Sequence, residues 1–209
     1  MAYIRTKICG ITTIEDALCA AKHGADAIGL VFFSGSPRCV SIKTAQEIVE
    51  KLPAFVSVVG LFVNQNIDEI QRIINSVSLD YLQFHGDETP EFCQQFNRPY
   101  IKAVRVQNEH DIQAALKAYP TARALLFDAY HPQQYGGSGE HFDWGMLPEK
   151  INRPWILAGG LNPDNVLNAI HSTNASAIDL SSGVEKDKGI KDHNKIKQLM
   201  QKIKDFQAA

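Results

Sequence analysis

Cys9 and Asp128 each end a short apolar stretch, and each carries a side chain that can exchange protons. A thiol kept ready as thiolate and a carboxyl group kept protonated can serve as general base and general acid in one pocket. Cys9 precedes Gly10, so we expect it at a rim, where neighbouring charges and helix ends can lower the pKa of a thiol. Apolar neighbours would favour the neutral, proton-donating form of Asp128. We therefore predict that Cys9 and Asp128 are the catalytic residues of acid–base chemistry.

Each of these residues also has a purely structural interpretation. A cysteine among apolar neighbours is often an inert core residue, and an acid at a strand end can cap a nearby backbone amide. His85 ends another apolar stretch and is either part of the same site or a hydrogen-bonded rim residue. Cys19, Cys39 and Cys93 are interpreted as structural, and all four thiols are expected to be reduced, because the chain has no CxxC pair.

Two glycine-containing turns indicate a phosphate site. Gly159 and Gly160 follow one late apolar run, and Ser182 and Gly183 follow the next. Glycine lets backbone amides approach a phosphate without a Cβ atom in the way, and serine hydroxyls add donors. A third cluster, Gly136–Gly139, is either a lid, a part of the same phosphate site or a flexible surface loop.

The elements that must position these residues follow from the apolar pattern, in which runs rich in Val, Ile, Leu and Phe alternate with amphipathic segments. Such alternation is typical of βαβ units and a parallel sheet. The predicted strands are Ile4–Cys9, Ala27–Phe32, Ser57–Phe62, Tyr81–His85, Tyr100–Val104, Ala124–Asp128, Trp155–Ala158 and Ala177–Leu180. The predicted helical segments are Ile14–Lys22, Lys43–Lys51, Ile67–Asn75, Pro90–Phe96, Glu109–Lys117, Met146–Glu149, Pro163–Ile170 and His193–Phe206, with Thr13 and Ser41 as N-caps of the first two.

Eight strands and eight helical segments in 209 residues predict one α/β domain over residues 1–209, a near-minimal (β/α)8 TIM barrel. An open doubly wound sheet is the alternative. In a barrel the carboxyl ends of all strands meet at one face, and phosphates are often held by the loops after strands seven and eight. This fold would bring Cys9, His85, Asp128 and both glycine turns to one mouth.

Composition excludes several classes of function. The net charge of -2, with scattered Lys and Arg, argues against nucleic acid as a partner. The apolar runs are far shorter than the roughly 20 residues that cross a bilayer, and the N-terminus has no signal-peptide pattern, so we expect a cytoplasmic protein that does not bind membranes. There is no His-Glu-x-x-His, GxGxxG or GxSxG motif. We therefore expect neither a metal nor a cofactor.

Several segments taken together resemble one family, phosphoribosylanthranilate isomerase of tryptophan biosynthesis. The matching segments are Lys7–Thr12, Ser36–Arg38, Gln83–Glu88, Gly136–Gly139 with Phe142–Trp144, Leu157–Leu161 and Asp179–Glu185. They span essentially the whole chain in the order of the family. The resemblance departs at Phe84, where the family usually has Leu, and at Ser138, where Thr is commoner.

The resemblance implies a cofactor-free Amadori rearrangement of the sugar phosphate N-(5-phosphoribosyl)anthranilate, with Asp128 as general acid and Cys9 as general base. It also implies that Arg38 holds the anthranilate carboxylate through a planar bidentate contact, although an isolated loop arginine is more often solvated. Asp179 and His85 are then expected to bind or orient the substrate. Gly159, Gly160, Ser182 and Gly183 are expected to bind its phosphate.

Three other functions are consistent with parts of the pattern. The isomerase of the histidine pathway performs the same type of rearrangement but resembles a pair-of-aspartates design, which Cys9 argues against. An indole-glycerol-phosphate synthase would have a longer N-terminal extension and more lysines at strand ends than Lys7. A phosphate-binding barrel without turnover would not need both Cys9 and Asp128. The chain is expected to work as a monomer or a homodimer.

Overall fold

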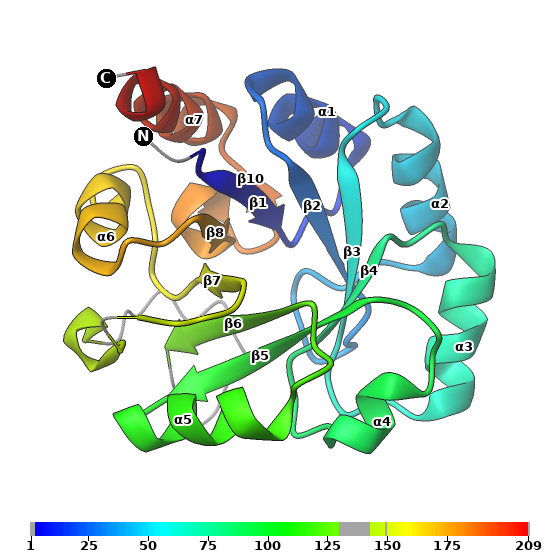
Figure 1. Ribbon diagram of the computed structural model, residues 1–209. Helices are drawn as coiled ribbons and strands as arrows, with labels where there is room; N and C mark the ends of the chain where they lie inside the picture. The colour runs from blue at the N-terminus through cyan, green and yellow to red at the C-terminus, as the bar shows by residue number, and fades with distance from the viewer. Residues whose placement is uncertain (1–2, 130–142, 149, 209) are drawn as a thin grey trace.

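The computed structural model describes residues 3–129, 143–148 and 150–208, and in it eight parallel strands close into a barrel (Figure 1). The strands pair in chain order, and β8 pairs with β1 to complete the closure. Their bounds are β1 Arg5–Cys9, β2 Ala27–Val31, β3 Ser57–Phe62, β4 Tyr81–Phe84, β5 Tyr100–Val106, β6 Ala124–Ala129, β7 Trp155–Leu157 and β8 Ala177–Leu180. The predicted TIM barrel is confirmed, and the open doubly wound sheet is excluded by the pairing of β8 with β1.

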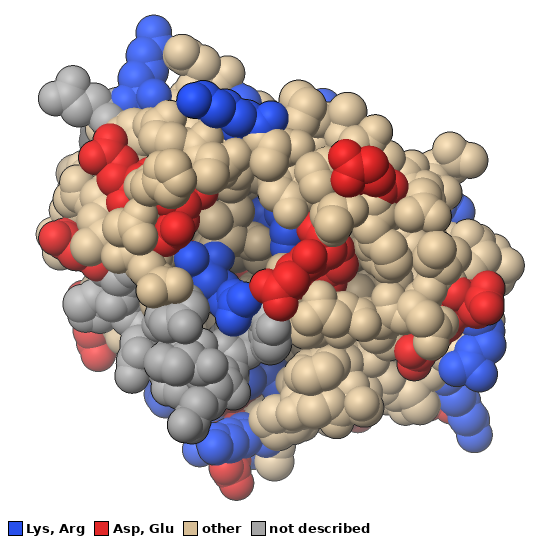
Figure 2. Space-filling model, turned by 90° about the horizontal axis from the view of Figure 1, so that it is seen from below, with Lys and Arg blue, Asp and Glu red and all other residues tan. Residues whose placement is uncertain are grey.

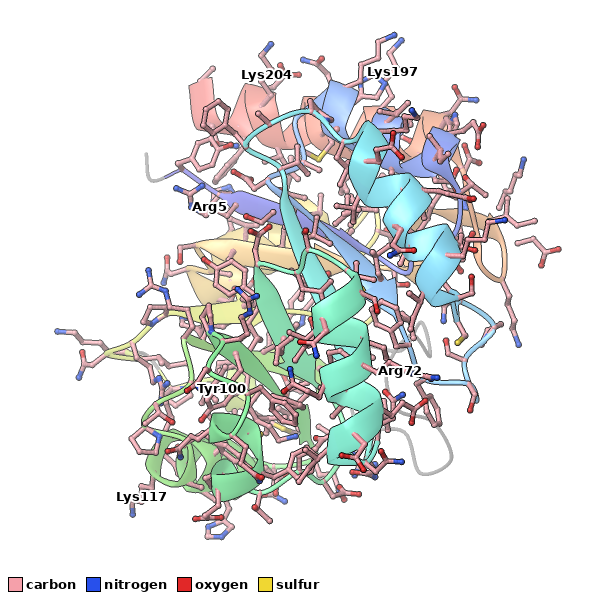
Figure 3. The ribbon with its side chains drawn as sticks, turned by 90° about the vertical axis from the view of Figure 1, so that its right-hand side faces the viewer. Arg5, Arg72, Tyr100, Lys117, Lys197 and Lys204 are labelled. Carbon is pink, nitrogen blue, oxygen red and sulfur yellow. The ribbon has the colours of Figure 1, made fainter. Side chains whose placement is uncertain are left out.

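Helices surround the barrel and connect its strands. They are α1 Ile14–His23, α2 Ile42–Lys51, α3 Ile67–Ser76, α4 Pro90–Gln94, α5 Glu109–Ala118, α6 Val166–Thr173 and α7 His193–Ala208. The predicted N-caps are confirmed, because the side chains of Thr13 and Ser41 accept hydrogen bonds from the third residue of their helices, at Asp16 N and Thr44 N. In Figure 3, Lys117, Lys197 and Lys204 point outward from α5 and α7. Among the described residues, no helix is both long and apolar enough to span a membrane.

The strands present alternate residues to two apolar layers, as the two-residue period of a strand requires. Residues such as Ile8 and Leu125 face outward and pack with the helices in the main core. Residues such as Ile101 and Leu126 face inward and fill the barrel with neighbours from other strands. Because the interior is packed, an open site is left only at an end of the barrel.

Two local predictions were wrong, and one small sheet was not predicted. Helix α6 begins at Val166 rather than Pro163, because the side chain of Asn162 accepts hydrogen bonds from the N–H groups of Asp164 and Asn165 and holds a turn there. The helical segment expected at Met146–Glu149 is a 3-10 helix at Trp144–Met146, with Glu149 outside the described residues. A small antiparallel sheet of β9 Glu185–Asp187 and β10 Ile190–Lys191, which the sequence did not predict, follows the barrel's last strand.

Candidate active site

A cavity of about 580 Å³ opens at the carboxyl ends of the barrel strands. Its lining includes eight of the nine predicted site residues, namely Cys9, Arg38, His85, Asp128, Gly159, Gly160, Asp179 and Ser182. Figure 2 shows a hollowed face on which basic and acidic side chains lie close together around the depression. The ninth residue, Gly183, is not among the lining residues; a Cβ atom there would collide with the carbonyl oxygen of Leu161. Gly183 therefore lets the loop after β8 pack closely against the loop after β7.

Cys9 lies at the end of β1, 5% exposed, in a cluster of aliphatic side chains. Lys7 is on the same face of β1 two residues earlier, and its Nζ atom lies 2.9 Å from both carboxylate oxygens of Asp179. Lys7 and Asp179 are register partners on β1 and β8, and both are buried. Burial by itself would lower the pKa of Lys7, but the charges of Asp179 and Cys9 raise it, so that Lys7 stays an ammonium.

The prediction that the Cys9 thiol has a lowered pKa was wrong. Burial raises the pKa of this thiol, because an apolar environment disfavours the thiolate, and the charge of Asp179 adds to the rise. The nearby ammonium of Lys7 acts in the opposite direction without cancelling the effect of burial. Burial likewise raises the pKa of the Asp179 carboxyl, whereas its 2.9 Å contacts with Lys7 favour the ionised pair.

Asp128 is held by hydrogen bonds on both carboxylate oxygens. Its Oδ1 accepts from the N–H of Ala129 at 2.9 Å, and its Oδ2 lies 3.0 Å from Nε2 of His85. The other ring nitrogen of His85, Nδ1, lies 2.9 Å from the amide nitrogen of Gln83. An amide that donates to Nδ1 leaves the ring proton on Nε2, from which it is donated to Asp128. The surroundings of Asp128 are therefore more polar than the sequence indicated.

Arg38 is buried in the loop between β2 and α2, so the alternative of a solvated loop arginine does not hold. Its Nε and Nη2 donate to the two carboxylate oxygens of Glu185 at 2.7 and 2.8 Å. Lys191 also contacts Glu185, at 2.8 Å. Burial would raise the pKa of Glu185, but hydrogen bonds from Arg38 and the charge of Lys191 lower it below its ordinary value. Two cations thus share one anion, which leaves a net positive charge on this group of three side chains.

The loop after β7 is shaped by two glycines with left-handed backbone conformations, Gly159 at φ 86° and Gly160 at φ 60°. The side-chain amides of Asn162 and Asn165 donate to the carbonyl of Gly160 and fix the orientation of its peptide group. A Cβ atom at Gly159 would lie 2.7 Å from the N–H nitrogen of Ala129, the donor that holds Asp128. Gly159 therefore leaves room for the N–H group that holds Asp128, and it also shapes the turn.

Other predictions have mixed outcomes. All four cysteines are free thiols, as predicted. The glycine cluster at Gly136–Gly139 and Phe142 lie outside the described residues. Over residues 3–129, 143–148 and 150–208, no three His, Cys, Asp or Glu side chains come together as a metal site.

A family model described as N-(5'phosphoribosyl)anthranilate (PRA) isomerase matches residues 6–202 of the chain. The chain belongs to the phosphoribosylanthranilate isomerase family. A family member from Neisseria meningitidis serogroup A is 59% identical over 196 residues, which are 94% of each chain. Another, from Pseudomonas fluorescens, is 52% identical over 209 residues, the full length of both.

Solved structures of phosphoribosylanthranilate isomerases have the same fold. The enzyme from Thermotoga maritima superposes with a TM-score of 0.89 at 40% identity, covering 97% of this chain and 99% of that one. A second isomerase structure, in complex with reduced 1-(o-carboxyphenylamino)-1-deoxyribulose 5-phosphate, gives a TM-score of 0.83 at 38% identity, with coverage of 97% and 99%. The resemblance inferred from the sequence motifs is confirmed.

Sequence reasoning missed four residues that support the site of this isomerase-family chain. Gln83 and Glu185 were quoted only as parts of family motifs, Lys7 was otherwise weighed only against the synthase alternative, and Lys191 was not considered. The signal for Lys7 and Gln83 was their spacing, because each lies two residues before a predicted site residue and so faces the same side of its strand. For Glu185 and Lys191, whose role depends on the unpredicted β9–β10 sheet, the sequence carried no usable signal.

Proposed function

We propose that this chain catalyses the Amadori rearrangement of N-(5-phosphoribosyl)anthranilate to 1-(2-carboxyphenylamino)-1-deoxyribulose 5-phosphate, a step of tryptophan biosynthesis. The observation that carries the proposal is that Cys9 and Asp128 line the same cavity of a barrel from this isomerase family. The isomerase complex with a reduced form of the rearranged compound supports this choice of substrate.

In the first step Asp128, as general acid, gives its proton to the ring oxygen of the furanose. The bond between that oxygen and C1′ breaks, and the lone pair of the anthranilate nitrogen forms the C=N bond of a protonated Schiff base. The hydrogen bonds from His85 and Ala129 hold the carboxyl group in place and stabilise the carboxylate that remains.

In the second step the thiolate of Cys9 takes the proton from C2′. The electrons of the broken C–H bond form the C1′=C2′ double bond and neutralise the iminium nitrogen, which gives an enolamine. Tautomerisation then places a proton on C1′ and removes one from the C2′ hydroxyl, leaving the ketone. C1′ is reduced and C2′ is oxidised within the same molecule, so these steps need neither a metal nor a redox cofactor.

Substrate binding is assigned to the residues around this pair. Glu185 occupies the edge of Arg38 formed by Nε and Nη2, so the anthranilate carboxylate is expected to meet the end of the guanidinium that carries Nη1. The phosphate is assigned to the loops after β7 and β8, at Gly159, Gly160, Ser182 and the adjoining Gly183. Asp179 is assigned to substrate orientation. We retain the predictions of a cytoplasmic location and of a monomer or a homodimer.

The first experiment measures turnover of phosphoribosylanthranilate generated in place, for the parent chain and for Cys9→Ala and Asp128→Asn. Rapid conversion by the parent, with losses of about 10²-fold or more in each variant, is expected, because each acid–base group typically contributes that much or more. No conversion by a folded parent would reject the proposal. The histidine-pathway substrate would then be assayed, and binding without turnover of either compound would indicate a non-catalytic barrel.

A further inference from the structure

Lys7 is a buried cation to which the proposed steps assign no role. It is 5% exposed, and its side chain faces the barrel interior from β1 on the same side as Cys9. A buried lysine is costly to keep charged unless a partner compensates for its lost hydration. Asp179 is that partner, and because Asp179 lines the cavity, its contact with Lys7 places an ammonium group next to the cavity wall.

Gly29 shows how close this ammonium is to the thiol. Gly29 pairs with Cys9 in the register between β1 and β2. A Cβ atom at Gly29 would lie 2.7 Å from Sγ of Cys9 and 3.0 Å from Nζ of Lys7. The sulfur and the ammonium nitrogen therefore border one small space, which stays open because residue 29 has no side chain.

The charged groups that face Cys9 come from several strands. Lys7 on β1 and Lys191 on β10 favour the thiolate, whereas Asp179 on β8 disfavours it. Lys191 is engaged by Glu185 at 2.8 Å and by the carbonyl of Ser181 at 3.1 Å. Lys7 is thus the cation whose position suits it best to interact with the sulfur.

His85 and Asp128, from the end of β4 and from β6, line the same cavity but are hydrogen-bonded to each other. Their mutual contact makes them less direct partners for the thiol than Lys7.

We propose that Lys7 is a positioning residue whose ammonium group, shared between Asp179 and the sulfur of Cys9, stabilises the thiolate that acts as base. The inference rests on the proposed function for the use of that thiolate, but the interaction itself exists in the free protein. On ionisation the proton of the Cys9 thiol leaves to solvent through the cavity, and Lys7 keeps its own proton. Asp179 then has a second effect, because it competes with the sulfur for the same ammonium.

The test measures alkylation of Cys9 by iodoacetamide as a function of pH, with the modified peptide quantified by mass spectrometry. Only the thiolate reacts, so the midpoint of the rate profile reports its ionisation. Lys7→Met removes the cation and is expected to move the midpoint up by about one pH unit or more. Asp179→Asn removes the competing anion and is expected to move the midpoint down.

These two variants break the same ion pair, so a purely structural role for it predicts shifts in the same direction. Opposite shifts therefore support the inference, and shifts in one direction, or none, overturn it. Lys102→Met is the matched control, because Lys102 is a similarly buried lysine paired with Glu88 at 3.1 Å, and its ammonium group also donates to the carbonyls of Phe84 and Gly86 at the end of β4 rather than lying next to Cys9. Its midpoint is expected to equal that of the parent. If Lys7→Met does not fold, as judged by circular dichroism, Lys7→Gln replaces it, and the shift of Asp179→Asn must still be downward.

The outcome is separable from that of the proposed function, because alkylation needs no substrate. Opposite shifts in a chain that does not convert phosphoribosylanthranilate would uphold the role of Lys7 and reject the isomerase reaction. Where the parent does turn over, one limb of kcat/KM against pH is expected to move in Lys7→Met in parallel with the alkylation midpoint. If both limbs stay in place while the midpoint moves, Cys9 is not the base that Lys7 serves.

Discussion

The two sides of the active-site cavity hold their proton-exchanging groups in different ways. Cys9 lies in a cluster of aliphatic side chains, and the charges that act on it are the ammonium groups of Lys7 and Lys191 and the opposing carboxylate of Asp179. Asp128 instead lies in a chain of hydrogen bonds that runs through His85 to Gln83. One side is thus controlled by burial and charge, and the other by directed hydrogen bonds.

This difference follows from the chemistry of the two groups. A thiol is a weak hydrogen-bond donor, so its environment acts on it mainly through desolvation and nearby charges. A carboxyl group accepts strong, directional hydrogen bonds that fix both its orientation and the side from which a proton moves. Variants that change charge should therefore act on the Cys9 side, and variants that change hydrogen bonding should act on the Asp128 side.

The largest expected effect is that of Cys9→Ser, which keeps a polar hydrogen but removes an ionisable thiol. We expect kcat/KM to fall by about 10²-fold or more, because a serine hydroxyl does not ionise near neutral pH. Steady-state turnover of phosphoribosylanthranilate measures this loss, with Cys19→Ser as a control that keeps parental activity. If Cys9→Ser keeps nearly the parental rate, the Cys9 thiol is not the base, and the burial and charges around it have no role in proton removal.

The next effect is the pH dependence of the parent enzyme. Because burial raises the pKa of the Cys9 thiol, the thiolate is a minor species at neutral pH, and its fraction grows as pH rises. We expect the rate of Cys9 alkylation by iodoacetamide in the parent to increase about tenfold per pH unit below that pKa, because only the thiolate reacts. A profile already flat from about pH 6 upward would contradict a raised thiol pKa.

A smaller effect is expected for Gln83→Leu, which removes the hydrogen-bond partner of His85 Nδ1. Losing one such bond costs about 1 kcal/mol, so kcat should fall roughly fivefold through a less well held His85 and Asp128. KM should change little, because Gln83 is assigned no contact with substrate in the proposed steps.

Nitrogen NMR of His85 provides the structural control for Gln83→Leu, since the ring proton should no longer be confined to Nε2. If both the tautomer of His85 and kcat are unchanged in this variant, Gln83 does not hold the His85 ring in place. The Cys9 alkylation midpoint should stay in place in this variant, which separates the two sides of the cavity.

The smallest effect concerns Cys93, a buried thiol in α4, where the nearby charge of Lys102 does not offset burial. Desolvation raises its pKa to about 12, so it should remain a thiol and resist iodoacetamide at neutral pH in the folded chain. Peptide mass spectrometry measures its labelling next to that of Cys9. Faster labelling of Cys93 than of Cys9 would show that charge near Cys9 does not favour its thiolate.

The sequence by itself determined the barrel and the placement of most of the site. Alternating apolar and amphipathic runs indicated eight strands, and a strand-end position was enough to bring Cys9, His85 and Asp128 to one mouth, because parallel strands in a barrel share one carboxyl-end face. The turn at Gly159 could also be predicted from the sequence, since positive φ angles favour glycine. Hydrophobic periodicity and turn-forming residues are local properties, so both can be recognised from the sequence alone.

The interactions between these residues were decided by the tertiary structure. Lys7 meets Asp179 across 172 residues of chain, and Arg38 meets Glu185 across 147, and in each case strand register or an unpredicted hairpin sets the pairing. Burial also reversed the expected direction of the Cys9 pKa, because desolvation depends on everything that packs around the sulfur. The residue types determine which groups can exchange protons. How readily they do so depends on distances and burial that exist only once the barrel has closed.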